Sequence, residues 1–147
     1  MVNVIEQVFR GLAGKDFSVT SAADAHYNCI AWAAGVNDDW WWPGDPGRTH
    51  WPASVPREER IEAFRLVFGM LGFEPSSSEE MELGFEKIAI FANALGIPKH
   101  AARQLPTGRW TSKLGKMEDI DHDLRDLEGA MYGSVVLVMK RKVHTAA

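Results

Sequence analysis

The stretch HAARQLPTGRWTSKL, residues 100–114, constrains the fold of this chain more than any other segment. Two runs suited to β-strands flank Pro-Thr-Gly, and a short loop that contains glycine is typical of a β-hairpin. With residues 106–108 as the loop, Gln104 lies opposite Trp110 in the paired strands. Side chains alternate between the faces of a sheet, so one face carries His100, Gln104, Trp110 and Ser112. The hairpin therefore predicts antiparallel pairing and a defined polar set on one face.

Periodic apolar residues predict the other elements. Helical spacing indicates helices over residues 4–12, 29–35, 57–71 and 117–128, and the β-branched run YGSVVLVMKRK indicates a strand near the end of the chain. The segment FEKIAIFA suits either a helix or a buried strand. Helices thus come first and mostly antiparallel strands follow, which is the order expected of an α+β domain.

Composition limits the classes of protein to consider. The 147 residues are 46% hydrophobic, so a single domain spanning residues 1–147 is expected, with a flexible tail over 143–147. The net charge is −4 and no basic stripe occurs, which argues against a nucleic-acid partner. No apolar run is long enough to cross a bilayer, and the N-terminus is a poor secretory signal. A cytoplasmic location and no membrane partner are expected.

Cys29 is the only cysteine and begins the short predicted helix over 29–35. Asn28 is a favourable N-cap, and Gly35 is a favourable residue after a helix end. In a first helical turn, free backbone N–H groups and the helix dipole favour the thiolate, which is the nucleophilic form of cysteine. A lone cysteine is also commonly buried as an apolar side chain. The residues alone leave both roles open.

A cysteine nucleophile needs an imidazole close to it in space, and the chain has five histidines. His100 begins the hairpin, where a strand can hold a base in a fixed position. Ser112 lies diagonally across from it in the predicted register and could orient the imidazole. We interpret His26 as a loop residue and His144 as part of the tail, whereas His50 lies in a tryptophan-rich loop.

That loop covers residues 37–55 and contains DDWWWPGDPGRTHWP. Its prolines exclude it from helix interiors and central strands, so a long structured loop is predicted. The tryptophans either close the core beneath the loop or form a platform that stacks on a sugar ring or clamps a peptide. In the second case Trp41 and Trp42 are candidate substrate-binding residues.

The motif YNCIAWAAG at 27–35, followed by HAARQLPTGRW at 100–110, resembles the papain-like cysteine hydrolases and, within them, the NlpC-type cell-wall amidases and endopeptidases. In that group a helix carries the cysteine and the histidine follows on an antiparallel strand. GRWTSKLG with DIDH behind it is similar to segments of bacterial proteins of this superfamily. The resemblance implies helices packed on a mostly antiparallel sheet, and it favours a strand at KIAIFA.

The resemblance also implies roles for individual residues. Cys29 takes the position of the nucleophile and His100 that of the general base. Ser112 or His122 takes the third position, where the family has His, Asn or Asp, so a serine departs from its pattern. Tyr27 is similar to a tyrosine that lines the oxyanion site of NlpC-type enzymes. The candidate substrate-binding residues are Tyr27, Asn28, Trp41, Trp42, Gln104 and Trp110.

The activity implied is cleavage or transfer at an amide, ester or thioester bond of a peptide- or acyl-type substrate, without cofactor or metal. One alternative is a non-catalytic module of the same fold that binds a peptide or glycan. A metal site built from His26, His100, His122 and an aspartate is a third hypothesis, but these spacings match no compact ligand motif.

Overall fold

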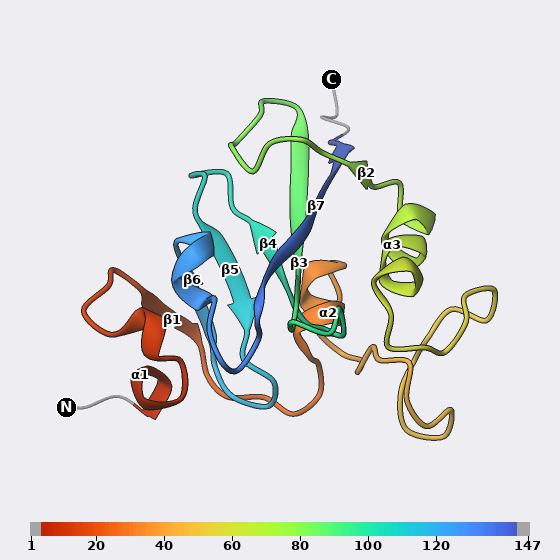
Figure 1. The fold of residues 1–147 in the computed structure, drawn as a ribbon, viewed down its shortest axis with the longest axis horizontal. Helices are drawn as coiled ribbons and strands as arrows, with labels where there is room; N and C mark the ends of the chain where they lie inside the picture. The colour runs from red at the N-terminus through yellow and green to blue at the C-terminus, as the bar shows by residue number, and fades with distance from the viewer. Residues whose placement is uncertain (1–3, 144–147) are drawn as a thin grey trace.

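The computed structural model describes residues 4–143, and its central feature is a seven-stranded antiparallel sheet with the order β1-β6-β5-β4-β3-β7-β2 (Figure 1). The strands are β1 (Ser18–Ser21), β2 (Glu74–Pro75), β3 (Phe85–Ala92), β4 (Pro98–Gln104), β5 (Trp110–Lys113), β6 (Asp119–His122) and β7 (Ser134–Lys142). The helices are α1 (Val4–Val8), α2 (Cys29–Ala33) and α3 (Ile61–Met70), with 3-10 helices η1 (Arg10–Leu12) and η2 (Leu124–Leu127). The predicted α+β class is confirmed.

Strand β3 resolves the ambiguous segment FEKIAIFA as a strand. It pairs with β4 on one side and along its whole length with β7 on the other. Residues 88–92 are buried, because both faces of the sheet are covered here. A strand buried on both faces has a continuous apolar sequence, which is why the same letters also suit a helix.

Two apolar clusters lie on opposite faces of the sheet. The first joins α2 and α3 to Ile88, Ile90 and Ala101, and the second joins α1, η1 and η2 to Ala89, Phe91 and Ala102. Figure 1 shows α1 beside β1 at one end of the molecule and α3 at the other, with α2 between them. Successive residues of β4 therefore face different clusters.

The predicted hairpin has the expected register. Gln104 pairs with Trp110, and Arg103 pairs with Thr111. These are the two residue pairs that join β4 to β5, while β4 continues to pair with β3 as far as Pro98. The first residues of β4 thus have β3 on one side, and their other side is not paired with β5.

The helix predicted over residues 117–128 is wrong. Residues 119–122 form β6 between β5 and β1, and only residues 124–127 are helical, as η2. The three apolar residues that predicted this helix, Ile120, Leu124 and Leu127, are indeed buried. The prediction of buried positions was therefore correct, but the assignment of one continuous helix to them was not. The alternating segment Asp-Ile-Asp-His satisfies a strand, and aspartate has a poor helix propensity.

Other boundaries differ less from the predictions. The first predicted helix is divided into α1 and η1, and α3 starts at Ile61 rather than at residue 57. Gly35 follows α2 with φ of 86°, as expected for a helix end. Strands β1 and β2 were not predicted, because both are short and exposed. Residues 144–147 of the predicted tail lie outside the described residues.

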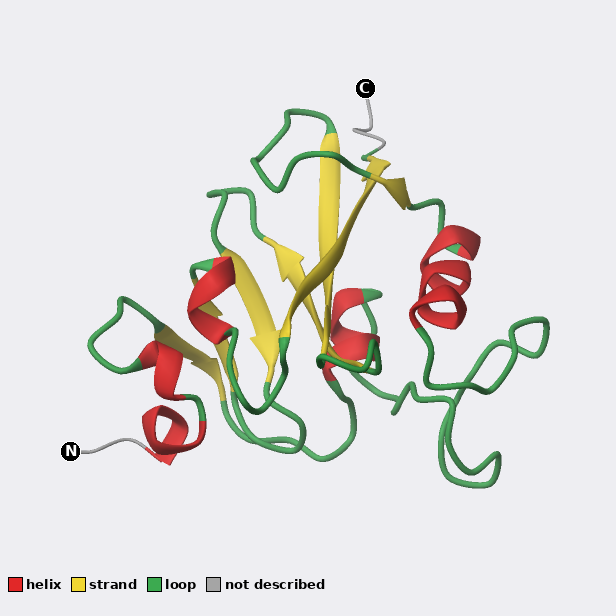
Figure 2. Cartoon of the chain, viewed as in Figure 1, coloured by secondary structure: helices red, strands yellow, loops and turns green. Residues whose placement is uncertain are grey.

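The tryptophan-rich loop between α2 and α3 is the long loop coloured green at the lower right of Figure 2. Trp51 is buried and its indole N–H donates to the carbonyl of Pro56 at 2.9 Å. The ring of Trp42 packs edge-on against Phe64 with centroids 5.3 Å apart. This loop therefore closes the first cluster. Within residues 4–143, no helix combines the length and apolar character that a membrane span needs.

Candidate functional site

Asn28 fixes the start of α2, as predicted for an N-cap. Its side-chain oxygen accepts from the backbone N–H of Ala31 at 3.2 Å and of Trp41 at 3.0 Å. Its amide nitrogen donates to the carbonyl of Trp41 at 2.7 Å. The side chain that we expected to bind substrate thus joins the tryptophan-rich loop to the helix start, and its amide is engaged at both ends.

Cys29 is the first residue of α2 and belongs to the first apolar cluster. It is only 6% exposed, and burial raises the pKa of its thiol to about 11. The backbone N–H of Ala101 opposes this shift by hydrogen bonding to the thiolate, and the charge of Lys113 opposes it at longer range. At neutral pH the group is therefore a thiol in this closed arrangement.

Three of the predicted catalytic residues form one buried hydrogen-bonded chain. His100 Nε2 lies 2.8 Å from Ser112 Oγ, and the same oxygen lies 2.7 Å from His122 Nε2. His122 Nδ1 lies 2.9 Å from the carbonyl oxygen of Asp123. The contact between His100 and Ser112 that the hairpin register predicted is confirmed.

The Asp123 carbonyl at the end of this hydrogen-bonded chain determines which nitrogen of each imidazole carries a proton, because a carbonyl oxygen only accepts. His122 must donate from Nδ1 to Asp123, and its neutral ring then accepts at Nε2 from the Ser112 hydroxyl. The serine oxygen accepts in turn from His100 Nε2–H. Burial lowers the pKa of both imidazoles, which favours these neutral forms. His100 Nδ1 is therefore left with a lone pair.

That lone pair has no hydrogen-bond partner among the described residues, although His100 is fully buried. The ring of Tyr132 covers the imidazole in a parallel stack, with centroids 4.0 Å apart and an interplanar angle of 6°. Phe91 meets the imidazole edge-on at 5.2 Å. The arrangement is a fixed, neutral proton acceptor enclosed by aromatic rings.

Two links connect the thiol to this imidazole. Ala101, whose N–H reaches the thiolate, is the residue after His100 in β4. Tyr132, which stacks on His100, has a raised pKa because it is buried and because the charge of Cys29 acts on it. The thiol nevertheless lies with the first cluster, and His100 Nδ1 forms no hydrogen bond to it. The structure thus packs Cys29 with the residue that follows His100 in β4, without pairing the thiol with the imidazole.

A second polar group surrounds the start of α2. The hydroxyl of Tyr27 donates to Asp119 Oδ2 at 2.7 Å, and Lys113 Nζ lies 4.9 Å from the centroid of the tyrosine ring. Lys113 Nζ also donates to the carbonyls of Asp24 and Gly115, both at 2.5 Å. This tyrosine, like Asn28, is thus held by protein contacts rather than open to substrate.

Sequence reasoning missed Tyr132, Lys113 and Asp119. Lys113 and Asp119 are paired across β5 and β6, so a correct strand assignment at 119–122 would have placed them together. Tyr132 had a weaker signal, a tyrosine next to Gly133 just before the last strand.

The remaining candidate substrate-binding residues have structural contacts. Gln104 donates through its amide to the carbonyl of Glu79 at 2.9 Å, and Trp110 is buried in the second cluster. Trp41 and Trp42 are half-buried and pack against the first cluster. The two tryptophans therefore help to close the core, which is one of the two roles that the sequence allowed.

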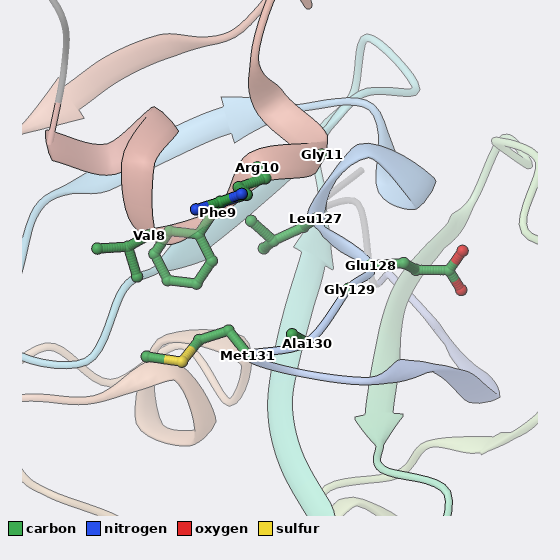
Figure 3. A pocket seen from close by; sticks show the side chains of 9 residues that line it. All are labelled: Val8, Phe9, Arg10, Gly11, Leu127, Glu128, Gly129, Ala130 and Met131. Carbon is green, nitrogen blue, oxygen red and sulfur yellow. The ribbon is translucent and has the colours of Figure 1, made fainter.

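Tyr132 belongs to a short strap, residues 128–133, that also borders a cavity of about 130 Å³. Figure 3 shows Val8, Phe9 and Met131 gathered on one side of this cavity, while Glu128 points away from them. Three other cavities, of about 440, 390 and 200 Å³, lie along β3 and β7. Cys29 and His100 line none of these four. Within residues 4–143, no three His, Cys, Asp or Glu side chains gather as a metal site would need.

Fold and site together define an α+β domain with a cysteine at a helix start and a buried His-Ser-His chain on one antiparallel sheet. A family model described as a domain of unknown function (DUF7689) matches residues 18–140. The chain belongs to this family, because the match covers most of its length. No curated protein and no solved structure matches it.

Proposed function

We propose that the chain is a cysteine hydrolase or acyltransferase of the papain-like, NlpC-like type, acting on an amide, ester or thioester bond. One observation supports this most strongly. His100 presents an unprotonated Nδ1 without a partner among the described residues, and Ala101, the next residue of β4, packs with Cys29 in the first apolar cluster. A neutral imidazole with a fixed tautomer is the form that a general base requires.

In the proposed reaction, His100 Nδ1 takes the proton of the Cys29 thiol while the sulfur bonds to the acyl carbon of the substrate. The leaving amine or alcohol takes that proton from His100, and a thioester remains on Cys29. Water, or an acceptor nucleophile in acyl transfer, then gives a proton to Nδ1 and attacks the thioester. Nδ1–H returns this proton to the departing sulfur, which restores the thiol and the neutral imidazole. Ser112 acts as a positioning residue that holds the Nε2–H side of the imidazole.

The proposal requires the site to open, since both groups are buried in the resting structure. The strap at 128–133 covers His100 through Tyr132 and is closed by two backbone hydrogen bonds between Gly129 and Gly133, of 2.8 and 2.9 Å. Hydrogen bonds of a catalytic pair are often long or absent without substrate and tighten when it binds. We infer that displacement of Tyr132 lets substrate reach the thiol and imidazole together.

Acylation by p-nitrophenyl acetate tests the proposal. One equivalent of p-nitrophenol should be released in a burst, and mass spectrometry should find the acetyl group on Cys29. His100→Gln should slow acylation by about 10²–10⁴-fold, as expected for loss of a general base. The matched control is His26→Gln, an exposed histidine bonded to Asp24, which should leave the rate unchanged. Acylation of His100→Gln at the wild-type rate would contradict the proposed role of His100.

The non-catalytic binding module remains a second candidate, and the burial of Cys29 favours it. A thiol with a pKa of about 11 is a weak nucleophile at neutral pH. In that case Cys29 alkylation by iodoacetamide at pH 7 should be no faster than that of free cysteine, and His100→Gln should not change its rate. A rate that exceeds free cysteine and depends on His100 would exclude this candidate.

A further inference from the structure

The cavity of about 440 Å³ lies where the start of β3 meets the ends of β4 and β7, in the upper part of Figure 1. Apolar side chains form much of its lining: Met81, Leu83, Phe85, Leu105, Pro106 and Val143. Leu83 is 89% exposed, which is unusual for a leucine on a folded surface. A space of this volume with an apolar lining has the size of a small-ligand site.

Arg103 is the polar group that distinguishes this cavity. Its guanidinium carbon lies 4.3 Å from the centroid of the Trp32 ring, so the planar group is stacked on α2. The indole is itself held, because its N–H donates to Thr111 Oγ1 at 3.2 Å. Among the described residues, no hydrogen bond or ion pair engages the guanidinium N–H donors. Arg103 is also one of the residues that line the cavity, so the stack fixes a half-buried guanidinium with unpaired donors beside it.

The acidic residues of the lining are engaged elsewhere. Glu82 accepts from Lys87 at 2.8 Å and from Lys140 at 3.2 Å, and Glu86 is paired with Arg141. Burial lowers the pKa of Arg103, and Glu86 opposes this shift only at a distance. Within residues 4–143, the positive charge of Arg103 at this cavity therefore has no direct counter-ion.

We propose that this cavity binds the C-terminal residue of a peptide, with its carboxylate on the Arg103 guanidinium and an apolar side chain against Leu83 and Val143. The fork of guanidinium donors matches the two oxygens of a carboxylate, and stacking on an aromatic ring holds its plane in place. The inference rests on Arg103 and its cavity, so it holds whether or not Cys29 is catalytic.

Titration of the 15N-labelled protein with N-acetyl-leucine, followed by NMR, tests it. The Arg103 Nε–H and Trp32 Nε1–H resonances should shift and saturate. N-acetyl-leucinamide lacks the charge and should bind at least about tenfold more weakly, since hydrogen bonds to a charged group are stronger than those to a neutral one. N-acetyl-Ala-Ala-Leu should bind at least as tightly as N-acetyl-leucine. Weaker binding of the tripeptide would overturn the peptide assignment in favour of a free acyl amino acid.

Variants identify the residues that bind N-acetyl-leucine. Arg103→Gln should weaken N-acetyl-leucine binding at least about tenfold. The affinity of Arg103→Lys should lie between those of the wild type and Arg103→Gln, because lysine keeps the charge and loses the fork of donors. Leu83→Ser, at a position too exposed to affect folding, should weaken it severalfold. Arg60→Gln, an exposed arginine paired with Glu58, is the charge-matched control and should bind normally. Equal binding by Arg103→Gln, or equal binding of acid and amide, would overturn the proposal. Should Arg103→Gln fail to fold, Leu83→Ser and the acid–amide comparison still decide it.

Discussion

At the scale of single residues, one hydroxyl determines the protonation of two histidines. Ser112 Oγ lies between His100 and His122, and a hydroxyl can donate its one proton only once. Because the Asp123 carbonyl requires a donor from His122, the serine proton must point to His122. His100 therefore has to donate, and its free nitrogen becomes the basic one.

This logic predicts that the two buried histidines are opposite tautomers at pH 7. His100 should carry its proton on Nε2 and His122 on Nδ1, which long-range 15N–1H correlation spectra of the imidazole rings distinguish directly. Ser112→Ala should release His100 from this tautomer while His122 keeps its proton on Nδ1. Observation of an Nδ1–H tautomer for His100 in the wild-type protein would remove the argument that it is poised as a base.

The hydrogen-bonded chain His100–Ser112–His122 should also stabilise the folded protein. Ser112→Ala leaves His100 Nε2–H and His122 Nε2 without their partner in a fully buried place, and each unsatisfied group costs about 1–3 kcal/mol. The free energy of unfolding from urea titration should fall by about 2–4 kcal/mol. The control Ser21→Ala removes an exposed hydroxyl from β1 and should change it by less than about 0.5 kcal/mol. A loss as small as that of the control would show that water replaces the serine.

At the scale of elements, β4 places residues with different roles on the two faces of the sheet. His100 and Ala102 face the second cluster, whereas Ala101 lies with Cys29 in the first, and Arg103 stacks on α2. A strand alternates its side chains strictly, so a shift of one residue would exchange these sets. The bulge where β4 meets the end of β3 lies beyond His100 and leaves this alternation intact.

The strap over His100 depends on Gly133. Its φ is 75°, and a Cβ there would lie 2.0 Å from the backbone oxygen of Ala92, which cannot move without disturbing β3. We expect Gly133→Ala to lower the free energy of unfolding by more than about 2 kcal/mol. Gly115→Ala is the matched control, because Gly115 has φ of 60° with no atom within 4 Å of its Cβ. That variant should lose only about 1–2 kcal/mol. Equal losses in thermal or urea unfolding would mean that the strap adjusts freely.

The parts that could be predicted from the sequence depend on local patterns. The hairpin register follows from a glycine-containing loop between two strands, and it placed His100 beside Ser112 correctly. The helix start at Cys29 follows from its N-cap. The strand at 119–122 did not follow, because helical and alternating patterns overlap there and the pairing with β1 joins residues about a hundred positions apart. Tyr132 reaches His100 in the same non-local way.

At the scale of the whole molecule, the sheet separates two buried regions that both contain titratable groups. Cys29 lies with the first cluster, and His100 and His122 lie beside the second. Burial raises the pKa of the thiol and lowers the pKa of the imidazoles, so each favours the neutral form. Folding thus keeps both the proton donor and the proton acceptor uncharged, and the two buried imidazoles make the stability of the fold depend on pH.

The stability of the fold should decrease as the pH falls below about 6.5, which is the ordinary pKa of histidine. Between that value and the lowered pKa of His100 and His122, the unfolded chain binds protons that the folded protein does not. The free energy of unfolding therefore falls with decreasing pH, by up to about 1.4 kcal/mol per pH unit for each of the two histidines. The carboxyl of Glu82, whose pKa is lowered by its hydrogen bond to Lys87, acts in the same direction only nearer its ordinary value of 4.5.

Urea unfolding followed by tryptophan fluorescence at pH 7.5, 6.5 and 5.5 measures this dependence. The decrease should be small between the first two values and steep between the last two. His100→Gln removes one of the two buried imidazoles. The dependence of its free energy of unfolding on pH should be weaker than that of the wild type by up to about 1.4 kcal/mol per pH unit, even if the variant is less stable at pH 7.5. Ser21→Ala, which removes an exposed hydroxyl that does not titrate in this range, should keep the wild-type slope. An unfolding free energy that stays constant down to pH 5.5 would mean that the buried imidazoles accept protons in the folded state, and the neutral His-Ser-His chain would have to be abandoned.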